Sequence, residues 1–150
     1  RWWSTTVHDA TVSLCLPGAP RVAGDAEAGS FGVVDLVVGT DAGEVRAMLL
    51  ASTSGVFPME SNFPDATSGD VLVQSDAGDG LRWWFTTRAV EGPTRGLTAR
   101  IPDAYGEDVL CSAHADLGPG VDEAAVWAAL SAVCRSMRLD GPTGGPCTAE

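Results

Sequence analysis

Hydrophobic and polar residues alternate along most of this chain, and that alternation predicts strands more often than helices. Near the N-terminus, Val12, Leu14 and Leu16 fall on one face of a strand over residues 10–16. A strand segment over residues 5–7 precedes it, with a turn at His8-Asp9 between the two segments. The chain therefore opens with two strand segments joined by a tight turn.

The next fifty residues combine a clear strand with two less regular stretches. Residues 21–30 are polar and rich in Gly and Ala, which predicts a loop, and residues 31–38 form a strand pattern. Residues 44–52 allow two interpretations, because their Ala, Met, Leu and Arg composition favours a helix. The short Thr-Asp-Ala-Gly turn at 40–43 favours a hairpin instead, and we choose the hairpin.

The middle of the chain contains its clearest hairpin signal. Residues 71–74 and 81–90 are rich in β-branched and aromatic residues and flank an Asp- and Gly-rich turn. The preceding residues 54–69 contain two prolines and predict an irregular crossover. Further strands are predicted over residues 97–101 and 108–115.

The C-terminal region carries the one strong helix pattern. Asp122 to Leu139 is predicted to be an amphipathic helix, with Asp122 as its N-cap and Gly141 as its stop. The apolar stripe of this helix comprises Val126, Trp127, Leu130, Val133, Cys134 and Met137. The predicted fold class is therefore α+β: an antiparallel β-sheet flanked by helices, with this C-terminal amphipathic helix packed on the sheet.

The chain length and composition fit one folded domain. The chain has 150 residues, of which 45% are hydrophobic and 19% charged. We predict a single α+β domain over residues 1–140 and a Gly/Pro-rich tail over 141–150, pinned by Cys147. No apolar run approaches the roughly 20 residues that span a bilayer. Because the sequence begins at Arg1 without Met, we interpret it as a mature or trimmed fragment, with any signal or membrane tether upstream.

The charge balance is strongly acidic. The formal net charge is −11, and all nine positive side chains, excluding histidine, are arginines. An acidic surface repels nucleic acid and anionic membranes, so neither is expected as a partner. In one interpretation the acidic surface keeps the protein soluble, and in another it binds a basic partner.

Four cysteines, Cys15, Cys111, Cys134 and Cys147, indicate either two disulfides or buried free thiols. With only two histidines and no C-x-x-C spacing, a structural zinc site is not expected. Four cysteines allow three pairings. We favour Cys111–Cys134, because a strand and the helix returning over it can lie side by side. Cys15–Cys147 would then pin the tail, and the protein would be extracytoplasmic, where disulfides persist.

Three segments together resemble the PsbP-like fold family, whose bacterial members include secreted proteins and lipoproteins. The first runs from Val12 to Pro20 and ends in a Pro-Gly-Ala-Pro corner; the second is the central hairpin continuing into residues 97–115. The third is the closing helix from Trp127 to Leu139, with its Ser-Met-Arg-Leu end. The resemblance covers about residues 11–139. It implies a central antiparallel sheet flanked by helices and a non-enzymatic binding role, with no residue roles to transfer.

Two tryptophan pairs are the candidate binding residues, and each follows an arginine. They are Trp2 and Trp3 after Arg1, and Trp83 and Trp84 after Arg82. Neighbours on a strand point to opposite faces, so in a one-sided sheet one Trp of each pair is exposed. Exposed Trp beside Arg is typical of interface hot spots. Alternatively, helices cover both faces and all four pack internally, or Trp2 and Trp3 lie next to a membrane.

Catalytic and metal-binding patterns are weak. His8-Asp9 and His114-Ala115-Asp116 place a histidine near an acid, but the chain has no Gly-x-Ser-x-Gly motif. Asp76 and Asp79 lie in the central turn without the D-x-[DN]-x-[DN]-G pattern of a calcium loop. We therefore predict no catalytic residues, no cofactor and no bound metal.

The function predicted from the sequence is a non-catalytic extracytoplasmic binding or accessory domain of PsbP-like type. It would dock a protein partner through an aromatic surface patch, and the sequence identifies no small-molecule ligand. The alternative is an acidic inhibitor or immunity protein that blocks a basic enzyme by charge complementarity. A third hypothesis is a small hydrolase that uses His114 and a nearby acid.

Overall fold

The computed structural model describes residues 1–52, 71–76, 83–104 and 107–147. Its elements are β1 (Trp2–Val7), β2 (Ala10–Cys15), β3 (Arg21–Ala28), β4 (Phe31–Thr40), β5 (Gly43–Ser52), β6 (Val71–Asp76), β7 (Trp83–Glu91), β8 (Thr94–Ala104), β9 (Glu107–Asp116), α1 (Glu123–Arg135) and β10 (Arg138–Leu139). The predicted strands over 31–38, 97–101 and 108–115 are confirmed, and so is the hairpin interpretation of residues 44–52. The predicted crossover over 54–69 lies outside the described residues.

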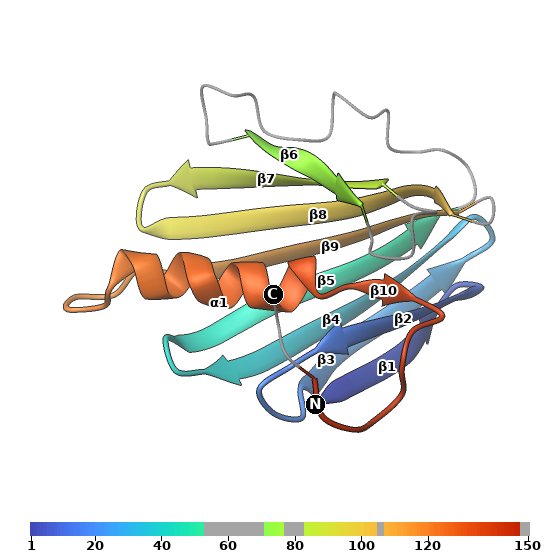
Figure 1. Cartoon of the computed structure of the whole chain (residues 1–150), viewed down its shortest axis with the longest axis horizontal. Helices are drawn as coiled ribbons and strands as arrows, with labels where there is room; N and C mark the ends of the chain where they lie inside the picture. Colours follow the sequence, from blue (N-terminus) through green and yellow to red (C-terminus); the bar gives the residue numbers. More distant parts are fainter. Residues whose placement is uncertain (53–70, 77–82, 105–106, 148–150) are drawn as a thin grey trace.

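The strands form two antiparallel sheets. The larger has seven strands in the order β3-β4-β5-β9-β8-β7-β6, and the smaller has three in the order β1-β2-β10. Helix α1 and the smaller sheet lie on the same face of the larger sheet (Figure 1). We call this the inner face and the opposite one the outer face.

The prediction of a sheet flanked by several helices is wrong for the described part of the chain, in which α1 is the only helix. Helix α1 contacts β8, β9 and β5, while β1 contacts β4 and β5. The smaller sheet thus covers the part of the inner face that a second helix would cover. The sequence has only one stretch with helical periodicity, so the other cover is built from strands.

Helix α1 is shorter than predicted. Asp122 is its N-cap, as expected, and accepts a hydrogen bond from the amide of Ala124 at 3.1 Å. The helix ends at Arg135, well before Gly141, because the hydroxyl of Ser136 donates to the carbonyl of Val133 at 2.8 Å and accepts from the amide of Cys15 at 2.9 Å. The chain then turns onto β2 and pairs with it as β10.

Strand β3 replaces the loop predicted for residues 21–30. It pairs with β4 through its backbone, with a register shift between Val22 and Gly24. Nearly all of its side chains are exposed on both faces. A strand that buries neither face shows no alternation of apolar residues, so the pattern could not reveal it.

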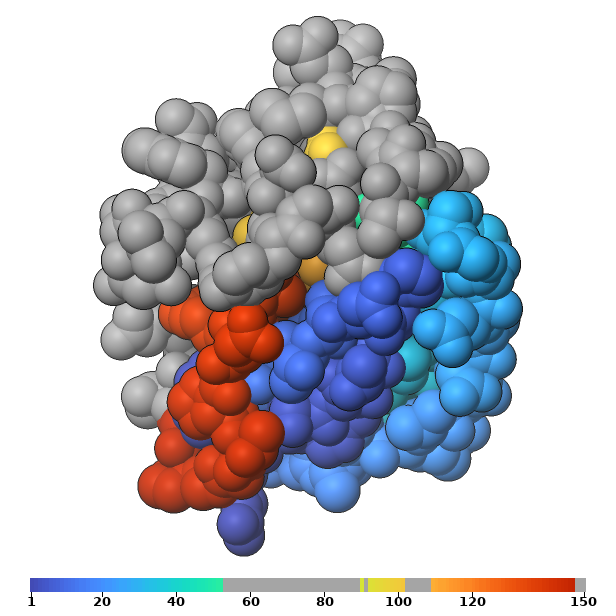
Figure 2. Space-filling model, turned by 90° about the vertical axis from the view of Figure 1, so that its right-hand side faces the viewer, coloured from blue at the N-terminus to red at the C-terminus, as the bar shows by residue number. Residues whose placement is uncertain are grey.

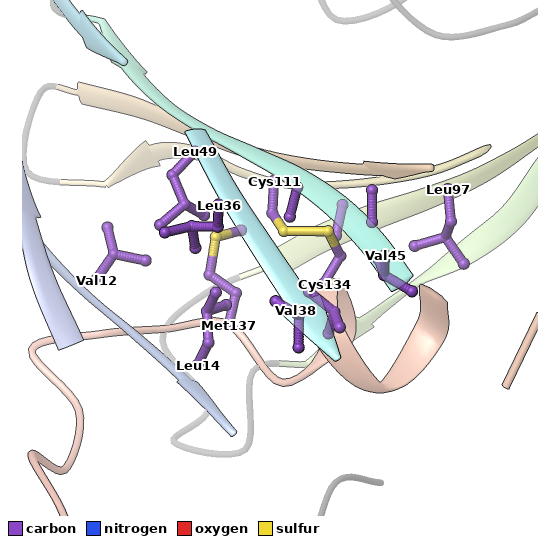
Figure 3. Packing of buried hydrophobic residues seen from close by; sticks show 14 of the residues in the cluster. Val12, Leu14, Leu36, Val38, Val45, Leu49, Leu97, Cys111, Cys134 and Met137 are labelled. Carbon is purple, nitrogen blue, oxygen red and sulfur yellow. A yellow bond between two sulfur atoms is a disulfide. The ribbon is translucent and has the colours of Figure 1, made fainter. Parts of the chain in front are cut away.

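The core lies between the inner face and its cover (Figure 3). Leu36, Leu49 and Leu97 of the larger sheet meet Leu14 of β2 and Leu130 of α1 in one buried cluster. The Cys111–Cys134 disulfide joins β9 to α1 inside this layer, and both side chains are fully buried. This pairing was the one favoured from the sequence, and it confirms the predicted contact between strand and helix.

The second disulfide, Cys15–Cys147, holds the C-terminal segment against the N-terminal strands. The amide of Trp2 donates to the carbonyl of Gly145 at 2.9 Å, and the amide of Gly144 donates to the carbonyl of Trp2 at 3.2 Å. Figure 2 shows this segment, in red, lying against the blue N-terminal strands. Both ends of the described chain are therefore fixed to the same hairpin.

A close backbone contact fixes the β1–β2 turn against the larger sheet. His8 occupies the left-handed region with φ 54°, and a Cβ atom placed on Gly32 of β4 would lie 2.7 Å from the backbone nitrogen of His8. Only glycine leaves room for this approach.

Gly32→Ala should therefore lower the free energy of unfolding by about 1–3 kcal/mol, because the added methyl group pushes two backbones apart. Gly39→Ala is the matched control on the same strand, since a Cβ atom there meets nothing within 4 Å. Urea denaturation of both variants measures the difference. Equal stabilities would contradict the close-contact argument.

The disulfides should differ in their contribution to stability, because Cys15–Cys147 has a sequence separation of 132 residues and Cys111–Cys134 one of 23. In the loop-entropy model, loss of these bonds costs about 5 and about 3 kcal/mol respectively. Unfolding of the two paired Cys→Ala variants without reductant tests this order. A larger loss for Cys111→Ala/Cys134→Ala would show that core packing outweighs loop closure.

Candidate binding site on the outer face of the large sheet

The outer face is open near the β4–β5 turn. Alternate residues of β4, β5 and β9 point away from the buried cluster there, and Asp35, Arg46 and His114 are exposed. The contacts of α1 and of the smaller sheet are made through the inner face. Within the described part of the chain, this end of the outer face is accessible to a partner.

Strand register brings three basic side chains into one row across this face. Arg21 of β3 pairs with Val37 of β4, Val37 with Arg46 of β5, and Arg46 with His114 of β9. Directly opposed residues of antiparallel strands have Cα atoms about 4.5–5.5 Å apart and share a face. The row is therefore compact, although its members lie 93 residues apart in sequence at most, from position 21 to position 114.

These side chains line a pocket of about 410 Å³. Its polar lining is Arg21, Arg46, His114 and Asp35, and its apolar lining includes Val37 and Met48. We call it the outer-face pocket. The volume lies within the range of small-ligand sites.

The basic side chains of the outer-face pocket form no ion pair with the described residues. No hydrogen bond or ion pair joins the side chains of Arg21, Arg46 or His114 to that part of the chain. Elsewhere, Arg95 donates from Nε to Glu123 Oε1 at 2.8 Å and so lowers the pKa of that carboxyl group. The pocket thus presents two guanidinium groups that form no ion pair with the described residues, an arrangement suited to holding an anion.

A larger hollow of about 600 Å³ lies between α1 and the β4–β5 turn. Its lining is mainly alanines of α1 with Leu16, Pro17 and Ala42, and its charged members Arg1 and Asp41 have opposite signs. Small apolar side chains select little by themselves. The outer-face pocket is therefore the better candidate for specific recognition.

The two tryptophan pairs lie in different sheets. Trp2 and Trp3 are half-buried on β1, and Trp3 packs against the core cluster. Trp83 and Trp84 begin β7, but their side chains and Arg82 lie outside the described residues. Strand β1, which carries the first pair, contacts β4 and β5 of the larger sheet. Strand β7, which carries the second pair, is separated from β5 by β9 and β8. The backbone therefore does not bring the two pairs into one patch. A docking role for each pair stays a prediction.

The two histidine motifs also lie apart. His8 Nδ1 lies 3.6 Å from Asp9 Oδ2 in the β1–β2 turn, whereas His114 lies on the outer face. Asp116 accepts a hydrogen bond from Thr94 at 2.9 Å, and the described lining of the outer-face pocket contains no Ser, Thr or Cys. This arrangement gives the His114 hydrolase hypothesis no support, and it stays a prediction.

No metal centre or membrane span is found where the chain is described. No three His, Cys, Asp or Glu side chains there are grouped to hold a metal ion. No helix in that part is long and apolar enough to cross a bilayer. Asp79, half of the weak calcium pattern, lies outside the described residues.

Comparison of the chain with protein-family models, curated proteins and solved structures finds no match. The resemblance to the PsbP-like family therefore stays a prediction.

Sequence reasoning missed Arg21 and Arg46 as candidate binding residues. Both sit at polar positions that look like ordinary solvent-exposed residues, and Arg21 lies in the segment predicted to be a loop. Only strand order and register place them beside His114. The sequence signal for this site was weak, because it consisted only of basic residues at polar positions in an otherwise acidic chain.

Arg46→Gln should leave the free energy of unfolding within about 0.5 kcal/mol of the wild type, because Arg46 is exposed and forms no ion pair with the described residues. Thermal denaturation at low salt provides the measurement. A clear loss of stability would show that Arg46 has a structural role and would weaken its assignment to a binding site.

Proposed function

We propose that this chain is a non-catalytic binding domain that acts outside the cytoplasm and holds an anionic group of its partner in the outer-face pocket. The observation that carries the proposal is the convergence of Arg21, Arg46 and His114 from three strands onto one pocket. Conversion of the bound group is not part of this function.

The extracytoplasmic location is supported by the cysteines. All four form disulfides, and no cysteine among the described residues is free. Such bonds persist in oxidising compartments and are rare in the cytosol. We propose a secreted or outward-facing anchored protein, in keeping with the interpretation of the sequence.

Recognition would depend on local charge. With a net charge of −11, the long-range field of the chain repels anions. A carboxylate would be attracted close to Arg21 and Arg46, where a guanidinium group can donate two parallel hydrogen bonds to it. The acidic surroundings would then restrict binding to ligands that reach Arg21 and Arg46. This favours specificity at the expense of a fast association rate.

A protein partner is the expected bearer of the anionic group. The half-buried apolar side chains of Val37 and Met48 border the charges, as in interfaces where apolar contact accompanies a few polar anchors. The docking role predicted for Trp83 and Trp84 stays a separate prediction. The acidic-inhibitor alternative keeps its original basis, the net charge, and stays a prediction.

Hexanoate is a suitable probe, because it offers one carboxylate and a short apolar chain. Its binding to the intact, oxidised protein can be followed by NMR chemical-shift changes of the Arg21, Arg46 and His114 backbone amides. We expect Arg46→Gln and Arg21→Gln each to weaken hexanoate binding by about two- to fivefold, the scale of exposed ion pairs.

Arg95→Gln is the matched control, because Arg95 is already paired with Glu123 outside the outer-face pocket. It should leave hexanoate binding unchanged. Equal losses of hexanoate binding in all three variants would refute the proposed function, and so would the absence of pocket shifts with every carboxylate tested.

A further inference from the structure

We infer that the outer-face pocket takes an amphoteric ligand, in which a carboxylate and a protonated amine or guanidinium are separated by a short aliphatic spacer. This inference rests on the proposed function and specifies the ligand class of the same site. It follows from Asp35, the one acidic residue among the described residues that line the pocket.

Asp35 lies on the same face as the basic row, two residues before Val37 on β4. It pairs with Met48 of β5, whereas Val37, two residues further on β4, lies between Arg21 and Arg46. Two residues of a strand span about 6.7 Å. The negative subsite at Asp35 and the positive subsite at Arg21 and Arg46 therefore lie on neighbouring rows of paired residues.

Each of these two rows also carries an apolar side chain beside its charged ones. Val37 lies within the basic row and Met48 lies beside Asp35, and both side chains are half-buried. Methylene groups of a ligand can rest on these side chains while its two ends remain charged. The pocket thus offers cationic, apolar and anionic contacts to one ligand.

Asp35 forms no ion pair with Arg21 or Arg46, or with any other described residue, although all three line one pocket. A purely anionic ligand would be repelled by the Asp35 carboxylate. An amphoteric ligand turns the same carboxylate into an attraction, and thus satisfies charges of both signs. The pocket therefore discriminates against simple anions.

Two sources offer this chemistry: free ω-amino acids, and the C-terminal lysine of a polypeptide, whose side-chain ammonium and terminal carboxylate have a similar spacing. Both share the carboxylate, the aliphatic spacer and the ammonium. The peptide Gly-Gly-Lys represents the second source, and its C-terminal amide lacks the required carboxylate.

The test compares 6-aminohexanoate with hexanoate and with 6-aminohexanamide on the intact, oxidised protein by NMR titration. We expect 6-aminohexanoate to bind about three- to fivefold more tightly than hexanoate, and the amide to bind weakest. Asp35→Asn should abolish the preference for 6-aminohexanoate over hexanoate, while Arg46→Gln should weaken both carboxylates. Asp41→Asn is the matched control, because this exposed acid lies on the β4–β5 turn outside the pocket lining, and it should keep the preference.

The outcomes separate the two proposals. Equal binding of 6-aminohexanoate and hexanoate would overturn the amphoteric inference and leave the anion-binding function intact. Absence of binding by both would overturn the proposed function itself. An unchanged preference in Asp35→Asn would refute the role of Asp35. Binding of Gly-Gly-Lys but not of its amide would support the polypeptide source, whereas binding of 6-aminohexanoate alone would support the free amino acid.

Discussion

Burial of one face of a seven-stranded sheet is the constraint on which this structure depends. The described residues form a single helix, α1, and the three-stranded sheet covers the rest of the buried face. The buried Cys111–Cys134 bond fixes α1 over β9, and Ser136 directs the chain from α1 onto β2. Because α1 and the smaller sheet both lie on the inner face, the described residues leave the opposite face open near the β4–β5 turn. The position of the pocket is thus a consequence of how the core is closed.

Much of the fold could be predicted from the sequence, because buried strands show their period of two. Strands β4, β5, β8 and β9 and the start of α1 were each signalled by alternation, turn residues or a capping Asp. Exposed β3 gave no such signal. The end of α1 was also missed, because Met137 continues the apolar stripe of the helix. The burial of Met137 and Leu139 comes instead from the chain crossing onto β2, which is a tertiary effect.

The candidate site was much less predictable, because it is a property of register. Arg21, Arg46 and His114 are unremarkable residues until β3, β4, β5 and β9 are aligned. A shift of one residue in any pairing would send one of them to the other face. Sequence reasoning instead selected tryptophans, whose size marks them locally. Local composition can thus identify the elements of a sheet without identifying the chemistry that its assembled surface presents.

The Cys15–Cys147 bond also has a mechanical consequence. It encloses residues 16–146 in a covalent loop that contains the larger sheet, α1 and β10. A pulling force applied at residue 1 and beyond residue 147 would pass from one sulfur to the other and would not load the strands inside the loop. Only β1 and the paired part of β2 lie on the loaded path. The outer-face pocket, inside the loop, would keep its shape under tension for as long as the disulfide remained oxidised.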